Sequence, residues 1–203
     1  MLRDQYRKTF AFLKTDIRKT YLICLAVFMI IFVLAACLTY FLVGIDGLER
    51  LLSGFGDTVD VKEEKTWYDF LLQNGRSNLI AVLSGLIPFL FIPGFLMVGN
   101  AAIGGFAVGG FALAYELSLV KSFFVGIAPH GVLEYAADLL GFALGILLCK
   151  RMIEGLRNKT LKATLPEYLI NSLRVYILVI LPVLLIAGIV ESTITPIVMD
   201  WLM

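Results

Sequence analysis

The sequence is poor in the residues from which most enzyme and nucleic-acid sites are built. Histidine occurs once in 203 residues, and only 16% of the residues are charged, with a net charge of +1. The charges form no basic face suited to nucleic acid. No serine or cysteine lies three or four residues from His130 to serve as its nucleophile. These shortages argue against a nucleic-acid-binding protein and against an enzyme.

The three cysteines indicate neither disulfide cross-links nor metal ligands. Cys24, Cys37 and Cys149 each lie inside an apolar run, where a cysteine behaves as a small hydrophobic residue. An odd number of cysteines without a close pair predicts neither a disulfide framework nor a zinc site made of thiolates.

Long hydrophobic runs are what the sequence has in abundance. Hydrophobic residues make up 60% of the chain, and the mean hydropathy is +0.90. Residues 21–45 carry no charge and are long enough to cross a hydrocarbon core of about 30 Å as a helix. Residues 78–115 are also uncharged, and Pro88 and Pro93 predict a break near their middle. The composition therefore predicts a polytopic membrane protein.

These runs predict an all-α bundle of five membrane segments. The first is the run at 21–45, and the uncharged stretch that follows the first loop divides into helices at 78–92 and 95–115. The helix at 78–92 is short for a full span, so a re-entrant hairpin with the next helix is an alternative. The last two segments are predicted at 123–149 and 175–196. Residues 20–203 would then form a single transmembrane domain.

The distribution of basic residues predicts how the chain is oriented. Residues 1–19 hold six of the 17 basic residues, and residues 150–174 hold six more with only two acids, which predicts a cytoplasmic loop. Residues 46–77 hold seven acids and four bases, which predicts an external loop. The protein is therefore expected to cross the membrane with its N-terminus cytoplasmic and its C-terminus outside.

The basic N-terminal segment also has a helical pattern. Between its charges, apolar residues recur every three or four positions over residues 1–19. We predict an amphipathic helix that lies on the cytoplasmic membrane surface, where anionic lipid attracts it. A solvated basic leader is the alternative.

Small residues are concentrated in the helix expected at 95–115. Gly105 and Gly109 form a G-x-x-x-G pair, which allows close approach of two helix backbones in a membrane. The pair can serve packing within one subunit or the contact of a homodimer, and a homodimer is expected. Asn100 lies in the same region, where an interhelical hydrogen bond is predicted.

One stretch of the chain combines ionisable residues with a membrane setting. His130, Glu134 and Asp138 follow at four-residue steps, which places them near one face of a helix. Ionisable groups within a membrane are costly and mark a functional surface, a pathway or a tight internal pairing. With the predicted orientation, Asn78 and Glu191 should lie at the same outer depth as His130 and Glu134, with Asp138 deeper.

Three interpretations of this polar cluster are open. It can be a structural network that holds the helices in register. It can be a site for a divalent metal such as zinc or manganese, with His130, Glu134 and Glu191 as ligands. It can also belong to a proton- or ion-coupled pathway.

Two motifs in this region resemble those of a known family. Pro129-His130-Gly131-Val132-Leu133-Glu134 resembles the P-H-G-x-x-E hallmark of the stage II sporulation protein M family, and residues 187–196 resemble its closing A-G-x-x-E-x-x-x-T-P. Asn78 and Asn100 are weaker matches, and the resemblance extends over residues 74–196. Tyr135 departs from the pattern, because smaller or aliphatic residues are usual there.

The resemblance implies a membrane scaffold without enzymatic activity, in a bacterial or archaeal cell membrane. Sporulating members belong to complexes that recruit peptidoglycan-degrading enzymes, so envelope proteins are the partners implied, reached through residues 46–77 or through faces within the membrane. His130, Glu134 and Glu191 occupy the motif positions. The alternative function is a small transporter or metal-binding membrane protein that uses the outward-facing cluster.

Overall fold

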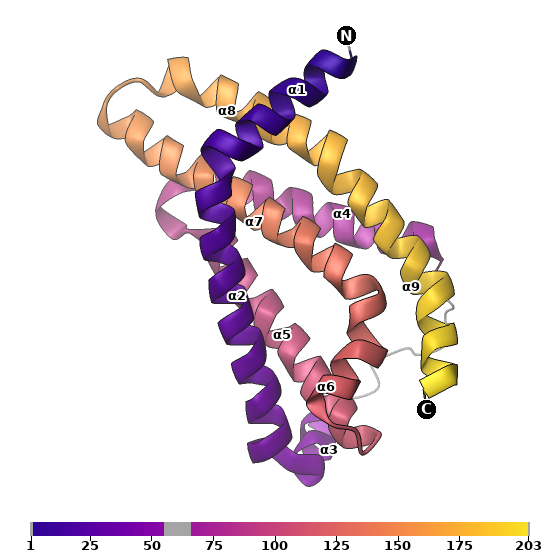
Figure 1. Ribbon diagram of the computed structural model, residues 1–203. Helices are drawn as coiled ribbons and strands as arrows, with labels where there is room; N and C mark the ends of the chain where they lie inside the picture. The colour runs from indigo at the N-terminus through magenta and orange to yellow at the C-terminus, as the bar shows by residue number, and fades with distance from the viewer. Residues whose placement is uncertain (1, 55–65, 203) are drawn as a thin grey trace.

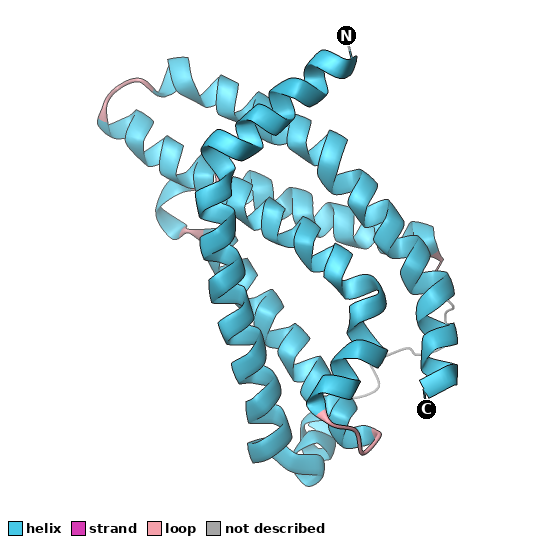
Figure 2. Cartoon of the chain, viewed as in Figure 1, coloured by secondary structure: helices cyan, strands magenta, loops and turns pink. Residues whose placement is uncertain are grey.

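The protein is a bundle of helices in the computed structural model, which describes residues 2–54 and 66–202 (Figure 1). Within those ranges the chain is helical except for short turns, and it contains no strand (Figure 2). The all-α prediction is confirmed. The start of α1 (Leu2–Phe12) and the end of α9 (Leu181–Leu202) lie toward opposite ends of the bundle (Figure 1).

Four helical stretches in the described residues are long and apolar enough to cross a membrane. They are Leu2–Leu48, Ile92–Ala114, Leu119–Arg157 and Thr164–Val198. Of the five predicted segments, four are therefore found as candidate spans, and a fifth membrane segment stays a prediction. The chain is a multi-pass membrane protein, and the side on which each end lies stays a prediction.

The helix predicted at 78–92 is not among these candidate spans. Residues 78–84 are instead the last part of α4 (Trp67–Ser84), after which the chain turns and forms the short 3₁₀ helix η4 (Pro88–Leu90). α5 (Ile92–Ala114) begins after Phe91, which has a left-handed backbone, and has Pro93 in its first turn. The prolines break the chain where expected, but α4 also includes Asp69 and Arg76, so it is less apolar than the four candidate spans.

The first helices follow one another without an intervening loop, and residues 2–38 are called the N-terminal rod below. α1 continues through the π-helical turn η1 (Leu13–Ile17) into α2 (Arg18–Leu38), and then through η2 (Thr39–Val43) into α3 (Gly44–Gly54). α1 is inclined to α2 (Figure 1). Residues 2–19 of the amphipathic helix predicted at 1–19 are thus helical and continue into the first span. Its place on the membrane surface stays a prediction.

A set of polar and aromatic contacts holds η1 to the other helices at this end. Arg151 on α7 (Ala128–Arg157) lies with its Nη2 3.8 Å from Asp16 Oδ1. Its guanidinium lies 4.6 Å from the ring centroid of Tyr168 on α8 (Leu161–Val175), which suits a cation–π contact. The Tyr168 hydroxyl donates to Asp16 Oδ1 at 3.4 Å. The N-terminal rod is therefore fastened to both α7 and α8.

The two charged stretches expected as loops are largely helical. Residues 150–174 belong to α7 and α8 apart from the turn at 158–160, because lysine, arginine and glutamate are good helix formers as well as charged. Within 46–77, the described residues form parts of α3 and α4, and residues 55–65 lie outside the described ranges. A capping box starts α4, in which the Thr66 N–H and hydroxyl donate to Asp69 Oδ2 at 2.9 and 2.7 Å.

The core forms where α7 packs against α2, α4, α5 and α9. Leu144 and Leu148 of α7 are fully buried there. Glycines permit the closest crossings: Gly85, at the end of α4, lies directly on the backbone of Gly145 in α7. Gly105 and Gly109 face the backbone of α2 in the same chain. The G-x-x-x-G pair therefore serves packing within the subunit, and a homodimer would need another surface.

Candidate functional site

The site begins where the chain enters α7. The helix α6 (Leu119–Ser122) leads into a π-helical turn, η5 (Phe123–Ile127), and α7 follows with Pro129 in its first turn. A proline is tolerated at that position because its missing N–H would have no intrahelical partner there. Single π-helical turns are frequent beside functional sites, since they change the direction in which the next side chains point. Here His130 is the third residue after the turn.

His130 is bonded across the bundle to α9. Its Nδ1 lies 3.0 Å from Thr195 Oγ1, and the Thr195 hydroxyl donates to the carbonyl of Val190 at 3.4 Å. Because that hydroxyl proton is used, the threonine oxygen can accept the Nδ1–H of a neutral imidazole. This tautomer leaves the lone pair on Nε2, which lies 4.0 Å from Glu191 Oε1.

Three groups with metal-ligand chemistry meet at this point. One ligand atom from each of His130, Glu134 and Glu191 lies within 4.8 Å of the others, and all three residues are partly buried. Imidazole nitrogen and carboxylate oxygen are ligands that zinc and manganese accept. A histidine that binds metal usually donates its other ring N–H to a fixed partner, and Thr195 is placed to be that partner.

Asp138 forms a second polar group with residues of two other helices. Its Oδ1 accepts from Asn78 Nδ2 of α4 at 3.2 Å, and its Oδ2 accepts from Asn100 Nδ2 of α5 at 3.3 Å. Asn78 Nδ2 also lies 3.0 Å from the carbonyl of Ala137. Asn78 and Asp138 are buried at 2% and 7% exposure. The interhelical bond predicted for Asn100 is present.

The structure thus places Asp138 apart from His130 and Glu134, although their spacing predicted one helix face for all three. His130 and Glu134 lie with Glu191 of α9, whereas Asp138 bonds to α4 and α5. Eight residues rotate an α-helix by about 80° beyond two full turns, so Asp138 points to a different neighbour. Asn78 is bonded to Asp138 instead of joining the outer cluster, because α4 starts at Trp67 and carries Asn78 further along the helix.

Two further residues shape this region and were not predicted as members of the site. Thr195, which orients His130, belongs to the closing motif, but the sequence does not show that it bonds to His130. Tyr135 packs its ring 5.1 and 5.8 Å from the ring centroids of Phe28 and Phe32 on α2. A side chain on Gly104 would overlap the Tyr135 hydroxyl, so this glycine makes room for the larger residue.

Comparison with known proteins gives one result that covers most of the chain. The family model of stage II sporulation protein M matches residues 22–196, which include the π-helical turn, α7 and the His130, Glu134 and Glu191 cluster. Searches of curated proteins and of solved structures found no match. On the match over residues 22–196, this chain belongs to the stage II sporulation protein M family of membrane proteins.

Proposed function

We propose that this chain is a non-enzymatic membrane scaffold that holds peptidoglycan-remodelling partners of the cell envelope. The observation that carries the proposal is that polar side chains inside the bundle form hydrogen bonds between pairs of helices. His130 bonds to Thr195 between α7 and α9, and Asn78 bonds to Ala137 and Asp138 between α4 and α7. Such bonds favour one fixed arrangement of helices, as a platform for partners requires.

Further hydrogen bonds from polar side chains also join helices of the bundle. The Tyr176 hydroxyl, in η6 (Tyr176–Ile180), donates to the carbonyl of Gly75 in α4 at 2.9 Å. The Ser122 hydroxyl donates to the carbonyl of Val108 in α5 at 2.7 Å. Together with the His130 and Asn78 bonds, these contacts connect α4, α5, α6, α7 and the helix that ends in α9. The bundle is therefore suited to hold an external surface in a constant shape.

The start of α4 is the surface that best fits a partner. Trp67 and Tyr68 expose 46% and 53% of their surface, and their ring centroids lie 6.0 Å apart. Exposed tryptophan and tyrosine side chains are enriched at the centres of protein interfaces. This aromatic pair belongs to the stretch 46–77 that is expected outside the membrane, where peptidoglycan enzymes act.

Photo-crosslinking in the native host tests the scaffold. A photoreactive amino acid placed at Trp67 or Tyr68 of the full chain should capture peptidoglycan-degrading or other envelope enzymes, because the proposed contact lies there. Val132 and Ile177, which are exposed at 56% and 58% in the apolar spans, are the matched control positions. The captured proteins are identified by mass spectrometry.

The pattern across positions decides the outcome. Enrichment of envelope enzymes by several-fold at Trp67 or Tyr68 over Val132 and Ile177 supports the scaffold. Equal capture at all four positions, or capture without any envelope enzyme, contradicts it.

A second function is favoured by the cluster of His130, Glu134 and Glu191. It is that of a divalent-metal-binding or metal-transporting membrane protein, with zinc or manganese as the ion. A bound ion would join α7 to α9 through one nitrogen and two carboxylate ligands. Ionisable groups placed together within a span are also typical of transport pathways.

Metal analysis of the purified full chain tests this second function. After exposure to zinc or manganese and removal of the excess, the wild type should keep about one ion per chain and His130→Ala should keep none. Thr195→Val should weaken binding by about 10–100-fold, because it removes the partner that orients the imidazole. Glu116→Gln, which changes an exposed carboxylate away from the cluster, should leave binding unchanged. Equal metal content in the wild type and His130→Ala would reject the metal site.

A further inference from the structure

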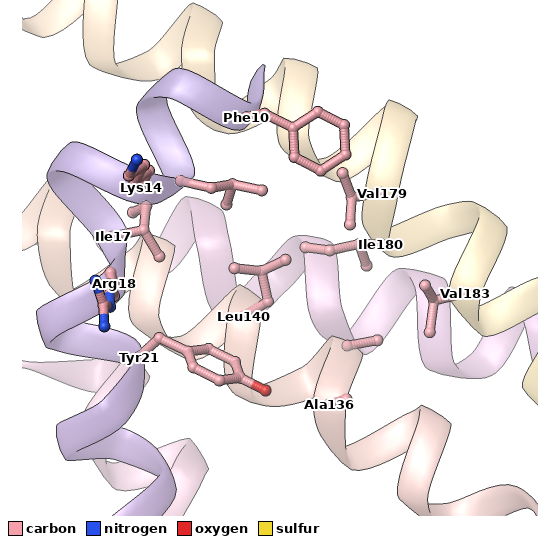
Figure 3. A pocket seen from close by; sticks show the side chains of 12 residues that line it. Phe10, Lys14, Ile17, Arg18, Tyr21, Ala136, Leu140, Val179, Ile180 and Val183 are labelled. Carbon is pink, nitrogen blue, oxygen red and sulfur yellow. The ribbon is translucent and has the colours of Figure 1, made fainter. Parts of the chain in front are cut away.

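An apolar groove runs between the N-terminal rod and the two long helices behind it. Its volume is about 570 Å³, and its walls come from α1, η1, α2, α7 and the helix formed by η6 and α9. Figure 3 shows Phe10 over one end of the groove beside Val179, and Leu140 between the two walls. Ala136 and Ala137 contribute only methyl groups from α7, which helps to leave this volume open. Ligand sites in proteins commonly enclose roughly 300–1,000 Å³.

Two cations stand at the side of the groove formed by the N-terminal rod. Lys14 and Arg18 are exposed, lie four residues apart and therefore share a helix face (Figure 3). Neither forms an ion pair with any residue in the described ranges. The acid between them, Asp16, is occupied by Arg151 and Tyr168. The groove thus combines an apolar floor with an uncompensated positive edge.

We propose that this groove is a binding site for one anionic phospholipid of the surrounding leaflet. An acyl chain would lie along the partly exposed Leu140, Val179 and Val183, and the phosphate would lie at Lys14 and Arg18. A lipid explains both features of the groove, because a phospholipid carries a negative group at one end of an apolar chain. An extended peptide would bring backbone N–H and C=O groups against walls of apolar side chains, where they would stay unsatisfied.

Tyr21 supplies a polar group at the intermediate depth. Its side chain reaches across the groove with the hydroxyl directed toward Ala136 (Figure 3). The hydroxyl bonds to no other residue that the structure describes. In a phospholipid, ester carbonyls follow the phosphate at the head of the acyl chains. The Tyr21 hydroxyl can donate to such a carbonyl one helical turn from Arg18.

Native mass spectrometry of the full-length protein tests the site. The chain is reconstituted with equal amounts of palmitoyl-oleoyl phosphatidylglycerol and the phosphatidylcholine with the same acyl chains. The wild type should retain one phosphatidylglycerol in preference to phosphatidylcholine. In Lys14→Gln/Arg18→Gln the preference should fall by roughly thirtyfold, about fivefold for each cation removed. Lys159→Gln/Lys162→Gln removes two exposed cations elsewhere and should keep the preference.

A second variant tests the apolar part. Ala136→Phe fills the groove and should abolish retention of either lipid, provided that its melting temperature shows a folded protein. Equal retention of both lipids by the wild type, no retained lipid, or an unchanged preference in Lys14→Gln/Arg18→Gln overturns the proposal. A polypeptide found in the groove in place of lipid also overturns it. Displacement of the bound lipid by soluble glycerol phosphate would also contradict the proposal, because it would show that the site binds the phosphate group alone and that the acyl chain does not contribute.

Discussion

Gly105→Ala is expected to destabilise the protein by roughly 3 kcal/mol, although alanine is the better helix former. A Cβ at this position would overlap the carbonyl oxygen of Phe32 and lie 2.8 Å from the Cβ of Ala35, both on α2. The obstacle is helix backbone, which cannot rotate away as a side-chain end can. The two helices would have to separate, and their dispersion contacts would be lost along the whole interface.

Gly99→Ala in the same helix is the matched control. A Cβ at Gly99 would meet nothing within 4 Å, so this change should be neutral or stabilising by up to about 1 kcal/mol. Thermal unfolding of both variants in the same detergent measures the difference. The same substitution is thus expected to lower stability at Gly105 and to cause no loss at Gly99, within a single helix. Equal shifts for Gly99→Ala and Gly105→Ala would contradict the close contact of α2 and α5.

Asn78→Ala is expected to cost about 2 kcal/mol of stability, because the amide has partners on another helix. The change removes the bonds to Ala137 and Asp138 at 3.0 and 3.2 Å and leaves a void against Gly141. Asn100→Ala breaks a single hydrogen bond, to Asp138, and should cost less. Asn171→Ala removes only a bond within α8, from Arg174, and is the control with the smallest expected effect.

A double-mutant cycle separates this network from local effects. If Asn78 and Asp138 act through their mutual bond, the loss measured for Asn78→Ala/Asp138→Ala should be smaller than the sum of the two single losses. Chemical or thermal unfolding in detergent measures all four proteins. Strict additivity, or an effect of Asn171→Ala as large as that of Asn78→Ala, would contradict the role given to Asn78.

The helix boundaries show how far local patterns reach. The predicted helix at 95–115 was found at Ile92–Ala114, because Pro93 is suited to a first turn and small residues continue the helix beyond it. The helix predicted at 78–92 lies instead at Trp67–Ser84. The prediction used the uncharged run, which begins at residue 78, and did not include the charged residues before it that start α4. Thr66 and Asp69 form the capping box that starts this helix, and their spacing was readable in the sequence.

Packing partners were harder to predict than helices. The sequence shows that Gly105 and Gly109 make one small face, but an identical face would serve a second copy or a neighbour in the same chain. In the structure α2 occupies it. Similarly, the four-residue spacing correctly predicted that His130, Glu134 and Asp138 lie on one helix. It did not show which neighbouring helices they face, and the structure places His130 and Glu134 with Glu191 but Asp138 with Asn78.

The chain by itself determined that this is an all-helical membrane protein of the stage II sporulation protein M family, because apolar length and the motif at His130 are local properties. The tertiary structure alone decided that Thr195 and Glu191 meet His130, and that Asn78 and Asn100 meet Asp138. Those partners stand far apart along the chain. Which side chains touch depends on the rotation and crossing of packed helices, and close packing of the whole bundle sets both.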